Sequence, residues 1–397
     1  MNVSALSPEN NPHHTALTSR ILVVDDVLLS RTVTEAYLRK HGFHDLETAE
    51  NGQQALEKAA SFKPDLIVLD LEMPVMDGYQ CCKQFRELDP ENLLVPVLIQ
   101  TGHTDTDKFL QALRHGANDI ISKPITESGL VKRVQKHMAR YHDIRKLLLS
   151  EDTKTTDDVL AQHVQQSIIP TKADLECLHT TTGLNFHALL RPCEGIGGDY
   201  WGVMPIGQDK TAFYLFDFSG HGLSAATSAC SVHLFMEQIF AYQSDPAAIF
   251  TTLNAHMQAI MPFGRYAVGV LIVLDRQNNS LTYAGAGTLP PILAQKNSVN
   301  PLDCSGTPLG LFADASYETR TVHLQNEWSL ALYSDALLEP GLGGATLLNA
   351  TDLNTSIGHY NVSGASELFG LIENKVKAFE ANLQDDLTFI LISKQAA

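Results

Sequence analysis

Two sets of carboxylates in this chain of 397 residues have the residue types and positions needed to handle phosphate. The first set lies in the first third of the chain, together with a hydroxyl and an amine: Asp25, Asp26, Asp70, Thr101 and Lys123. Three carboxylates in one place repel one another, so a hard cation that prefers oxygen ligands, such as Mg²⁺, would neutralise them. With that cation present, Asp70 could act as a nucleophile towards a phosphoryl donor and form an acyl phosphate. The lysine amine and the threonine hydroxyl would contact the phosphate oxygens.

The second set is spread over the second half of the chain and consists of aspartates: Asp199, Asp217, Asp335 and Asp385. Neither cysteine nor clustered histidine accompanies them, and carboxylate oxygens favour Mg²⁺ or Mn²⁺ over zinc. Two such ions about 3.5–4 Å apart can lower the pKa of a water between them and hold a phosphate ester for in-line attack. The first set therefore predicts a site that holds a phosphoryl group, and the second predicts a site that removes one.

Each of these residues also has a simpler explanation when it is taken alone. A single Asp after a strand is commonly a solvated loop residue or a helix N-cap, and Gly197-Gly198-Asp199 by itself is typical of an ordinary turn. For His221 the alternatives are a general acid and a Gly-His-Gly turn, of which we favour the turn. Asp386 either assists the metal site or caps the last strand. The prediction therefore depends on the sets rather than on their members.

Short apolar runs alternate with helical periodicity from residue 21 onwards, which indicates buried parallel strands separated by helices. The apolar runs are 21–24, 65–69 and 95–99, and a helical pattern covers 29–38. The pattern predicts a doubly wound α/β domain whose ligands lie at the carboxyl ends of a parallel five-stranded sheet. Since Asp25-Asp26, Asp70 and Thr101 each follow such a run, the fold would bring them to one rim.

The second half of the chain predicts an α+β domain, a β-sandwich flanked by helices. Beyond residue 184, β-rich runs cover 212–216, 268–274, 329–333 and 387–392, and three of them end or begin beside an aspartate of the second set. Helical patterns lie between these runs, at 224–242, 247–259 and 365–381. Strand ends would therefore bring the aspartates together.

A linker of two helices is expected between the two domains. Apolar residues recur with amphipathic helical spacing over 126–149, a polar run covers 151–158, and a helical pattern over 159–169 ends at Pro170. We expect a disordered tail over 1–19, the first domain over 20–140, the helical linker over 141–188 and the second domain over 189–397.

Composition argues against several classes of protein. The formal net charge of −17 would repel nucleic acid, and the chain lacks a basic stretch or a helix-turn-helix pattern that would offset it. No run of about 18 apolar residues occurs, so neither a membrane span nor a secretion signal is expected. Six cysteines without metal-ligand spacing fit a reducing compartment. We expect a cytoplasmic protein with no nucleic-acid or membrane partner.

Four short motifs surround the first carboxylate set, at 23–26, 69–78, 101–102 and 122–124. Through them, residues 21 to about 149 resemble a bacterial two-component receiver domain. The resemblance implies Mg²⁺ bound by Asp25 or Asp26, by Asp70 and by the backbone of Glu72, with Asp70 accepting phosphate from a sensor histidine kinase. The chain departs from this family at Ile120, where an aromatic switch residue is usual. Phosphorylation would then be relayed without an aromatic swing.

Further motifs accompany the second set, at 166–170, Asn254, 284–287, 290–291 and 306–310. With the four aspartates they make residues 159–393 resemble the metal-dependent (PPM-type) serine/threonine protein phosphatases of bacterial stress and sporulation signalling. The resemblance implies two Mn²⁺ or Mg²⁺ ions, with water rather than a side chain as the nucleophile. The implied metal ligands are Asp199, Asp217, the carbonyl of Phe218, Asp335 and Asp385.

Two residues depart from this second family. Thr288 stands where a histidine is frequent, and Ala336 stands where a glycine commonly follows the aspartate. If the backbone at residue 336 needed a positive φ, alanine would cost activity.

We therefore predict a response regulator, phosphorylated on Asp70, that controls a metal-dependent phosphoserine/phosphothreonine protein phosphatase. The resemblance implies a phosphorylated anti-sigma-factor antagonist as substrate in a partner-switching pathway. As a hypothesis, phosphorylation alters the helical linker 130–169, with a homodimer through the receiver and linker helices as one route. The alternative is a non-catalytic adaptor whose degenerate phosphatase fold only binds a partner. The retained aspartates argue against the adaptor, because clustered acids repel one another without metal.

Overall fold

The computed structural model divides the chain into two compact units, Met1–Glu151 with Ala255–Pro262, and Asp152–Asn254 with Phe263–Ala397. The structure describes residues 19–88, 95–102, 111–113, 115–149, 168–193, 197–219, 223–260, 265–296, 298–341, 344, 346–360, 364–379 and 382–395. Among these residues, no helix has the length and apolar character needed to cross a membrane. The polar run and almost all of the second linker helix that the sequence predicts lie outside the described residues.

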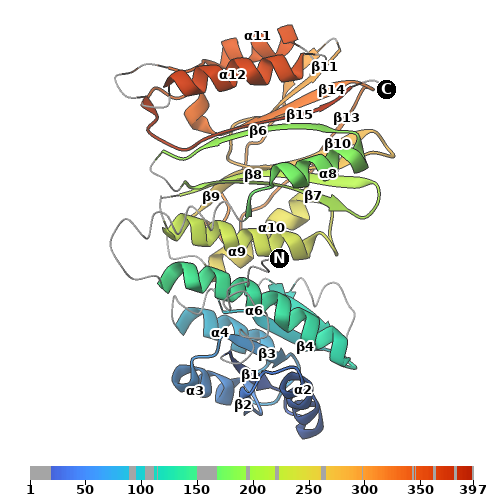
Figure 1. Cartoon of the computed structure of the whole chain (residues 1–397), viewed down its shortest axis with the longest axis vertical. Helices are drawn as coiled ribbons and strands as arrows, with labels where there is room; N and C mark the ends of the chain where they lie inside the picture. The colour runs from blue at the N-terminus through green and yellow to red at the C-terminus, as the bar shows by residue number, and fades with distance from the viewer. Residues whose placement is uncertain are drawn as a thin grey trace, which may run out of the picture. The chain divides into compact units, whose positions relative to one another are not determined.

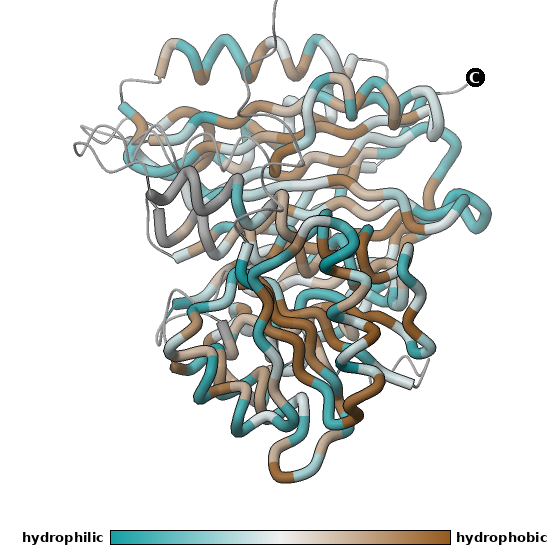
Figure 2. Tube along the Cα trace, turned by 60° about the horizontal axis from the view of Figure 1, so that its bottom comes forward, coloured by the Kyte–Doolittle hydropathy of each residue, from teal (hydrophilic) through white to brown (hydrophobic). Residues whose placement is uncertain are grey.

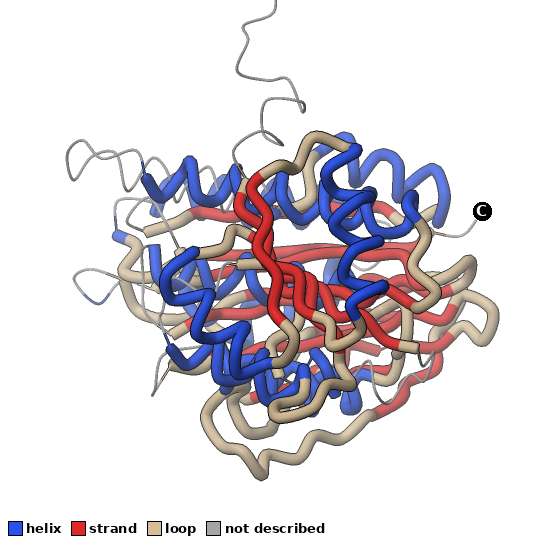
Figure 3. Tube along the Cα trace, turned by 90° about the horizontal axis from the view of Figure 1, so that it is seen from below, coloured by secondary structure: helices blue, strands red, loops and turns tan. Residues whose placement is uncertain are grey.

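A parallel five-stranded sheet forms the centre of the first unit, with strand order β2-β1-β3-β4-β5 (Figure 1). The strands are β1 (Arg20–Val24), β2 (Asp45–Ala49), β3 (Leu66–Asp70), β4 (Val97–Thr101) and β5 (Asp119–Ser122). The helices are α2 (Leu28–Lys40), α3 (Gly52–Phe62), α4 (Gly78–Leu88) and α6 (Glu127–Leu149). Viewed from below, the strands lie between helices on two sides (Figure 3). The predicted doubly wound α/β fold is confirmed.

The inner strands of this sheet are apolar along their whole length because both faces are covered. Every residue of β3 and β4 is buried, and the strands form a hydrophobic band inside the first unit (Figure 2). The edge strand β2 is exposed or half-buried except at its last residue. Burial on two faces therefore explains why the central runs were readable in the sequence.

A buried arginine at the end of α4 aligns the two strands on one side of the sheet. Arg86 donates from Nη1 to the carbonyl of Val95 at 2.7 Å and from Nε to the carbonyl of Gly116 at 3.0 Å. Its Nη2 atom also donates to Oδ1 of Asn118 at 2.7 Å, and the same oxygen accepts from the Val97 backbone at 2.8 Å. Arg86 and Asn118 thus hold the starts of β4 and β5 side by side. The opposite ends of these two strands carry Thr101, the last residue of β4, and Lys123, which follows β5.

Two antiparallel sheets of five strands stack face to face in the second unit (Figure 1). One sheet has the order β13-β10-β9-β8-β7 and consists of β7 (Asp199–Ile206), β8 (Lys210–Phe218), β9 (Ala267–Asp275), β10 (Ser280–Ala286) and β13 (Arg320–His323). The other has the order β12-β11-β14-β15-β6 and consists of β6 (Asn185–Arg191), β11 (Ile292–Gln295), β12 (Ser298–Pro301), β14 (Trp328–Tyr333) and β15 (Leu387–Lys394). The predicted sandwich is confirmed.

Helices cover the outer faces of this sandwich. They are α9 (Leu223–Ile239), α10 (Pro246–Ile260), α11 (Ala350–Tyr360) and α12 (Ala365–Phe379), and a short 3₁₀ helix η3 (Asp335–Leu337) follows β14. Helix α8 (Lys172–Thr182) instead contacts β6, and its Leu175 packs against the core between the two sheets. Buried leucine and isoleucine residues of α11 and α12 pack on β14 and β15, and Phe250 of α10 contacts Phe216 of β8 with ring centroids 6.0 Å apart. Both sheets are therefore buried on two faces.

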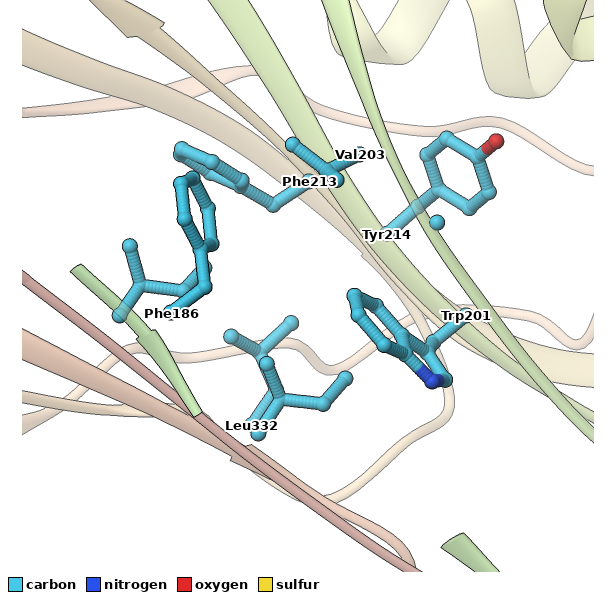
Figure 4. A pocket seen from close by; sticks show the side chains of 9 residues that line it. Phe186, Trp201, Val203, Phe213, Tyr214 and Leu332 are labelled. Atoms are coloured by element: carbon cyan, nitrogen blue, oxygen red, sulfur yellow. The ribbon is translucent and has the colours of Figure 1, made fainter. Parts of the chain in front are cut away.

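The main core of the second unit lies between its sheets. Trp201, Phe213, Trp328 and Ile390 are among its fully buried side chains. Figure 4 shows Phe186, Trp201 and Leu332 around a gap in this core that has no room for a water molecule. The gap is a packing imperfection rather than a ligand site.

Two elements extend across the domain boundaries that the sequence suggested. Helix α6 continues past residue 140 to Leu149, and strand β6 begins at Asn185, before residue 188. The boundaries stay predictions.

Candidate functional site

The first carboxylates meet at the carboxyl edge of the parallel sheet. Asp25 follows β1 and Asp70 ends β3, and these neighbouring strands pair Val24 with Leu69. Ligand oxygens of Asp25, Asp26 and Asp70 lie within 4.8 Å of one another, with Asp26 exposed and the other two residues buried. The sheet register therefore assembles the cluster that the sequence predicted.

Lys123 lies between two of these carboxylates, with Nζ 2.9 Å from Oδ2 of Asp25 and 2.8 Å from Oδ2 of Asp70. Burial raises the pKa of Asp70 against the hydrogen bond and charge of Lys123, and the charge of Asp25 adds to the rise. Burial alone would lower the pKa of Lys123, but its hydrogen bonds to Asp70 and Asp25 raise it overall. Three carboxylates against one ammonium leave excess negative charge among oxygen donors, so these residues fit one Mg²⁺ ion.

Backbone and hydroxyl donors orient the Asp25 carboxylate. The Val27 N–H donates to Oδ1 at 2.8 Å, and the Ser30 hydroxyl donates to Oδ2 at 2.5 Å. Close packing also shapes the Asp70 loop, because a Cβ atom at Gly78 would lie 2.3 Å from the Asp70 carbonyl oxygen. Only glycine lets α4 begin so near the predicted phosphoacceptor.

The other receiver residues lie around this cluster. Thr101 is buried at the end of β4 and its carbonyl accepts from the Lys123 N–H at 2.7 Å, whereas Glu72 is exposed in the loop after β3. Ile120 is 8 % exposed in β5 and pairs with Ile99. The aliphatic side chain at the switch position is therefore packed into the sheet. The metal-binding role of the Glu72 backbone stays a prediction.

The second set gathers at one end of the sandwich and draws on both sheets. Asp199 begins β7 and pairs in register with Asp217 of β8. Asp335 begins η3 and is separated by one residue from the end of β14, and Asp385 lies shortly before β15, which pairs with β14. The Thr388 hydroxyl of β15 donates a 2.6 Å hydrogen bond to Oδ2 of Asp199 and so joins the two sheets at this end.

The charges of these acids disfavour one another's ionisation. Burial raises the pKa of Asp217 to about 7, and the charges of Asp335, Asp385 and Asp386 add to the rise. Burial and the charge of Asp217 raise the pKa of Asp199 well above its ordinary value. Burial and the charge of Asp385 also raise the pKa of Asp335. These side chains offer only oxygen atoms as ligands, and their ionisation is disfavoured unless a positive charge lies nearby. Such a set fits hard divalent cations.

Several neighbours of this set were missed by sequence reasoning. The charge of Asp335, burial and the charge of Asp385 raise the pKa of Glu339, whose N–H donates to the Asp335 carbonyl at 3.0 Å. Ser334 and Thr388 connect β14 to β15, because the Ser334 hydroxyl accepts from the Thr388 N–H at 2.8 Å. The spacing of four residues from Asp335 to Glu339 was the one available signal, since it places both on one helical turn.

Some predicted residues lie outside what the structure describes or keep an untested role. His221 is outside the described residues, as are Gln166 and Ser167. Phe218 is buried at the end of β8, where its N–H donates to the Gly198 carbonyl at 3.1 Å. Its carbonyl as a metal ligand stays a prediction, and so do the alternatives for His221.

The backbone at Ala336 does not need glycine. Ala336 is buried in η3, and within the described part of the chain the non-glycine residues with positive φ are Lys63, Val75 and Asn279. The anticipated cost of alanine at this position is therefore not present in the fold. Its methyl group packs into the core between β14 and the outer helices.

Asn254 holds one of the glycine motifs in place. Its Oδ1 accepts from the Gly310 N–H at 2.7 Å, and its Nδ2 donates to the Phe312 carbonyl at 2.9 Å. Gly310 has φ +85°, a conformation that L side chains rarely adopt. This motif therefore shapes a loop.

Comparison with known sequences places a different family in each half of the chain. Residues 21–135 match the response regulator receiver domain, and residues 207–395 match stage II sporulation protein E (SpoIIE). The chain is 32% identical over 117 residues to the chemotaxis protein CheY of Bacillus subtilis, which covers 30% of this chain and 95% of CheY. It is 36% identical over 124 residues, or 31% of the chain, to the alkaline phosphatase synthesis transcriptional regulatory protein PhoP of the same species. The chain spans half the length of PhoP and less of other multidomain relatives.

A solved structure shows the fold of the second half. The SiaA-PP2C domain of Pseudomonas aeruginosa aligns with a TM-score of 0.53 at 19% sequence identity, over 61% of this chain and 96% of that domain. The two stacked antiparallel sheets with outer helices are thus the fold of a PP2C domain.

Proposed function

We propose that this chain is a phosphorylation-controlled protein phosphatase. It belongs to the response regulators and joins their receiver domain to a PP2C-fold domain of the SpoIIE type. Its substrate would carry phosphoserine or phosphothreonine. The observation that carries the proposal is the meeting of Asp199, Asp217, Asp335 and Asp385 at one end of both sheets. Acids that raise one another's pKa have no structural use without a cation, which argues against a purely adaptor role.

In the receiver domain, Asp70 would accept a phosphoryl group from a sensor histidine kinase. One carboxylate oxygen of Asp70 forms the new P–O bond as the P–N bond of the donor phosphohistidine breaks. Lys123, already within hydrogen-bond distance of Asp70, would pair with the phosphoryl oxygens, and the Thr101 hydroxyl would donate to them. Mg²⁺ held by Asp25 or Asp26, by Asp70 and by the Glu72 backbone would supply the charge that offsets the incoming phosphate.

In the phosphatase domain, the aspartates would bind the metal ions, and neighbouring side chains would orient the aspartates. When bound, two Mn²⁺ or Mg²⁺ ions would supply the charge that activates water and neutralises the phosphate ester. Asp199, Asp217, Asp335 and Asp385 would hold them, together with the Phe218 carbonyl. Thr388 restricts one oxygen of Asp199 by its hydrogen bond and so fixes the orientation of this carboxylate. Protons held by Asp199 and Asp217 would leave as the ions bind.

A phosphorylated anti-sigma-factor antagonist is the substrate that we propose within this class. The match of residues 207–395 to the SpoIIE model supports this choice. The net charge of −17 supports a protein rather than a nucleic acid as the substrate. Phosphorylation of Asp70 would act through the helical linker 130–169, with dimerisation of receiver and linker helices as one route.

Hydrolysis of p-nitrophenyl phosphate and of a phosphoserine peptide tests the phosphatase. We expect Mn²⁺-dependent turnover by the full chain and a loss of about 100-fold or more in Asp217→Asn, because removing a ligand forfeits several kcal/mol of transition-state stabilisation. The matched control is Asp275→Asn, a half-buried acid at the last position of β9. A full chain that hydrolyses neither compound at any Mn²⁺ concentration would support the adaptor instead.

A further inference from the structure

Both side-chain oxygens of Asp386 are occupied by backbone donors. Oδ1 accepts from the Cys193 N–H at 2.8 Å, and Oδ2 accepts from the Gly198 N–H at 2.5 Å. The residue is 7 % exposed. Burial raises its pKa overall, and the hydrogen bonds from the Cys193 and Gly198 N–H groups offset part of this rise. The carboxylate therefore ties the start of β7 to the start of β15.

The main chain of Asp386 reaches the other two acids of the site. Its N–H donates to Oδ1 of Asp385 at 2.8 Å. Its carbonyl accepts from the hydroxyl of Ser334 at 3.0 Å, and Ser334 directly precedes Asp335. Asp386 therefore contacts Gly198 next to Asp199, Ser334 next to Asp335, and the side chain of Asp385.

Gly197 leaves the space that the Asp386 carboxylate fills. A Cβ atom at Gly197 would lie 2.2 Å from Oδ2 of Asp386 and 2.6 Å from Oδ1, with the carboxyl carbon between them at 2.3 Å. These three atoms are the nearest neighbours of that position, and Gly197 is not among the glycines with positive φ. Alanine at residue 197 would therefore require the Asp386 carboxylate to move, whereas the backbone conformation would accept it.

We infer that Asp386 is a positioning residue, which sets the backbone at Asp199, Asp335 and Asp385 for metal binding and is not itself a metal ligand. The inference rests on the proposed function, because it concerns the same candidate metal site. It also assigns a purpose to the Gly197-Gly198-Asp199 motif: Gly197 makes room for the carboxylate, and Gly198 donates to it.

A double-mutant cycle between residues 197 and 386 tests the inference. The variants are Asp386→Ala, Gly197→Ala and both together, each made in the full chain carrying Asp25→Asn to remove the receiver cluster from the measurement. Mn²⁺ affinity and the number of ions bound are measured by isothermal titration calorimetry. The matched control is Gly370→Ala in α12, where an added Cβ meets nothing within 4 Å.

Each single variant should weaken Mn²⁺ binding by about 10–100-fold, the usual effect of losing a group that orients metal ligands. The number of ions bound should stay that of the parent. The double variant should bind no more weakly than Asp386→Ala, because the added methyl group then enters space that the carboxylate has left. The Gly370→Ala control should bind as the parent does.

Three outcomes would overturn the inference. The first is a double variant whose loss of Mn²⁺ affinity equals the product of the two single losses. The second is a Gly197→Ala variant that binds Mn²⁺ as tightly as the parent. The third is an Asp386→Ala variant that binds one Mn²⁺ ion fewer than the parent. If a single variant does not fold, Asp386→Asn replaces Asp386→Ala, since it keeps one oxygen acceptor and should weaken binding less. If the parent binds Mn²⁺ but hydrolyses no phosphate ester, the proposed function is refuted. The inference about Asp386 is still tested in that case, because the double-mutant cycle measures Mn²⁺ affinity and not hydrolysis.

Discussion

The stability of the second unit should fall as pH rises when divalent ions are removed. In the unfolded chain an aspartate titrates near pH 3.9, about its model-peptide value, whereas in the fold the pKa of Asp217 is raised to about 7 by burial and by the neighbouring acids. Between these two pH values the native state binds more protons than the unfolded state. The free energy of unfolding therefore decreases with rising pH, which is opposite to the usual behaviour of a paired aspartate.

The loss of unfolding free energy depends on the difference between the pKa of Asp217 in the unfolded chain and in the fold. Each pH unit in that interval costs about 1.4 kcal/mol, so raising the pH from 5 to 7.5 should destabilise the unit by about 3 kcal/mol through Asp217 alone. In Asp217→Asn this contribution is absent. Asp199 and Asp335 have raised pKa values as well, so their contributions have the same sign and remain partly present in that variant.

Tryptophan fluorescence during urea unfolding is the assay. The chain has two tryptophans, and both Trp201 and Trp328 are buried in the core of the second unit, so the signal reports on this unit. The measurement is made in EDTA for the wild type, Asp217→Asn and the control Asp275→Asn, whose carboxylate accepts hydrogen bonds from Gln277 and Asn278 and has a lowered pKa. Saturating Mn²⁺ should reverse the trend, because the ions compete with protons.

A wild-type stability in EDTA that stays constant or rises from pH 5 to 7.5 would refute this reasoning. So would an Asp217→Asn variant with the same pH slope as the wild type. In either case the carboxylates would not repel one another in the fold, and the main argument for a cation site among them would be lost.

Three further predictions follow from single contacts. Thr388→Val should lower the free energy of unfolding by about 1–3 kcal/mol in urea titrations, because a buried oxygen of Asp199 loses its donor, while Thr388→Ser should stay near the wild type. Ala336→Gly should cost about 0.5–1 kcal/mol in the same assay without raising hydrolysis, since η3 does not need glycine; faster hydrolysis would contradict this. Asp70→Asn should gain no mass from acetyl phosphate in intact mass spectrometry, and labelling equal to that of the wild type would place the phosphoacceptor elsewhere.

The parts of the fold that the sequence predicted are those where burial is uniform or periodicity is strong. The runs that became β3 and β4 were readable because both faces of the sheet are covered. Strand β2, with residues Asp45–Ala49, lies at the sheet edge and is mostly half-buried, so it has no apolar run to read. Short exposed strands such as β13 were missed for the same reason.

The candidate sites were predictable to the extent that strand ends locate them. The carboxyl-edge rule brought Asp25 and Asp70 together correctly, because it depends only on parallel topology. The bond from Thr388 to Asp199 joins residues 189 positions apart on different sheets, and no local pattern encodes such a pairing. The two backbone contacts of the Asp386 carboxylate were out of reach for the same reason.

The position of β15 in its sheet has a consequence for how the protein is made. β15 is the last strand in the sequence, yet it lies between β14 and β6, and β6 joins the sheet only through it. Asp385 and Thr388 arrive with this strand. Until β15 has been made and has inserted between β14 and β6, the second sheet is incomplete and the four aspartates are not assembled, so the proposed metal site can form only after this strand is in place.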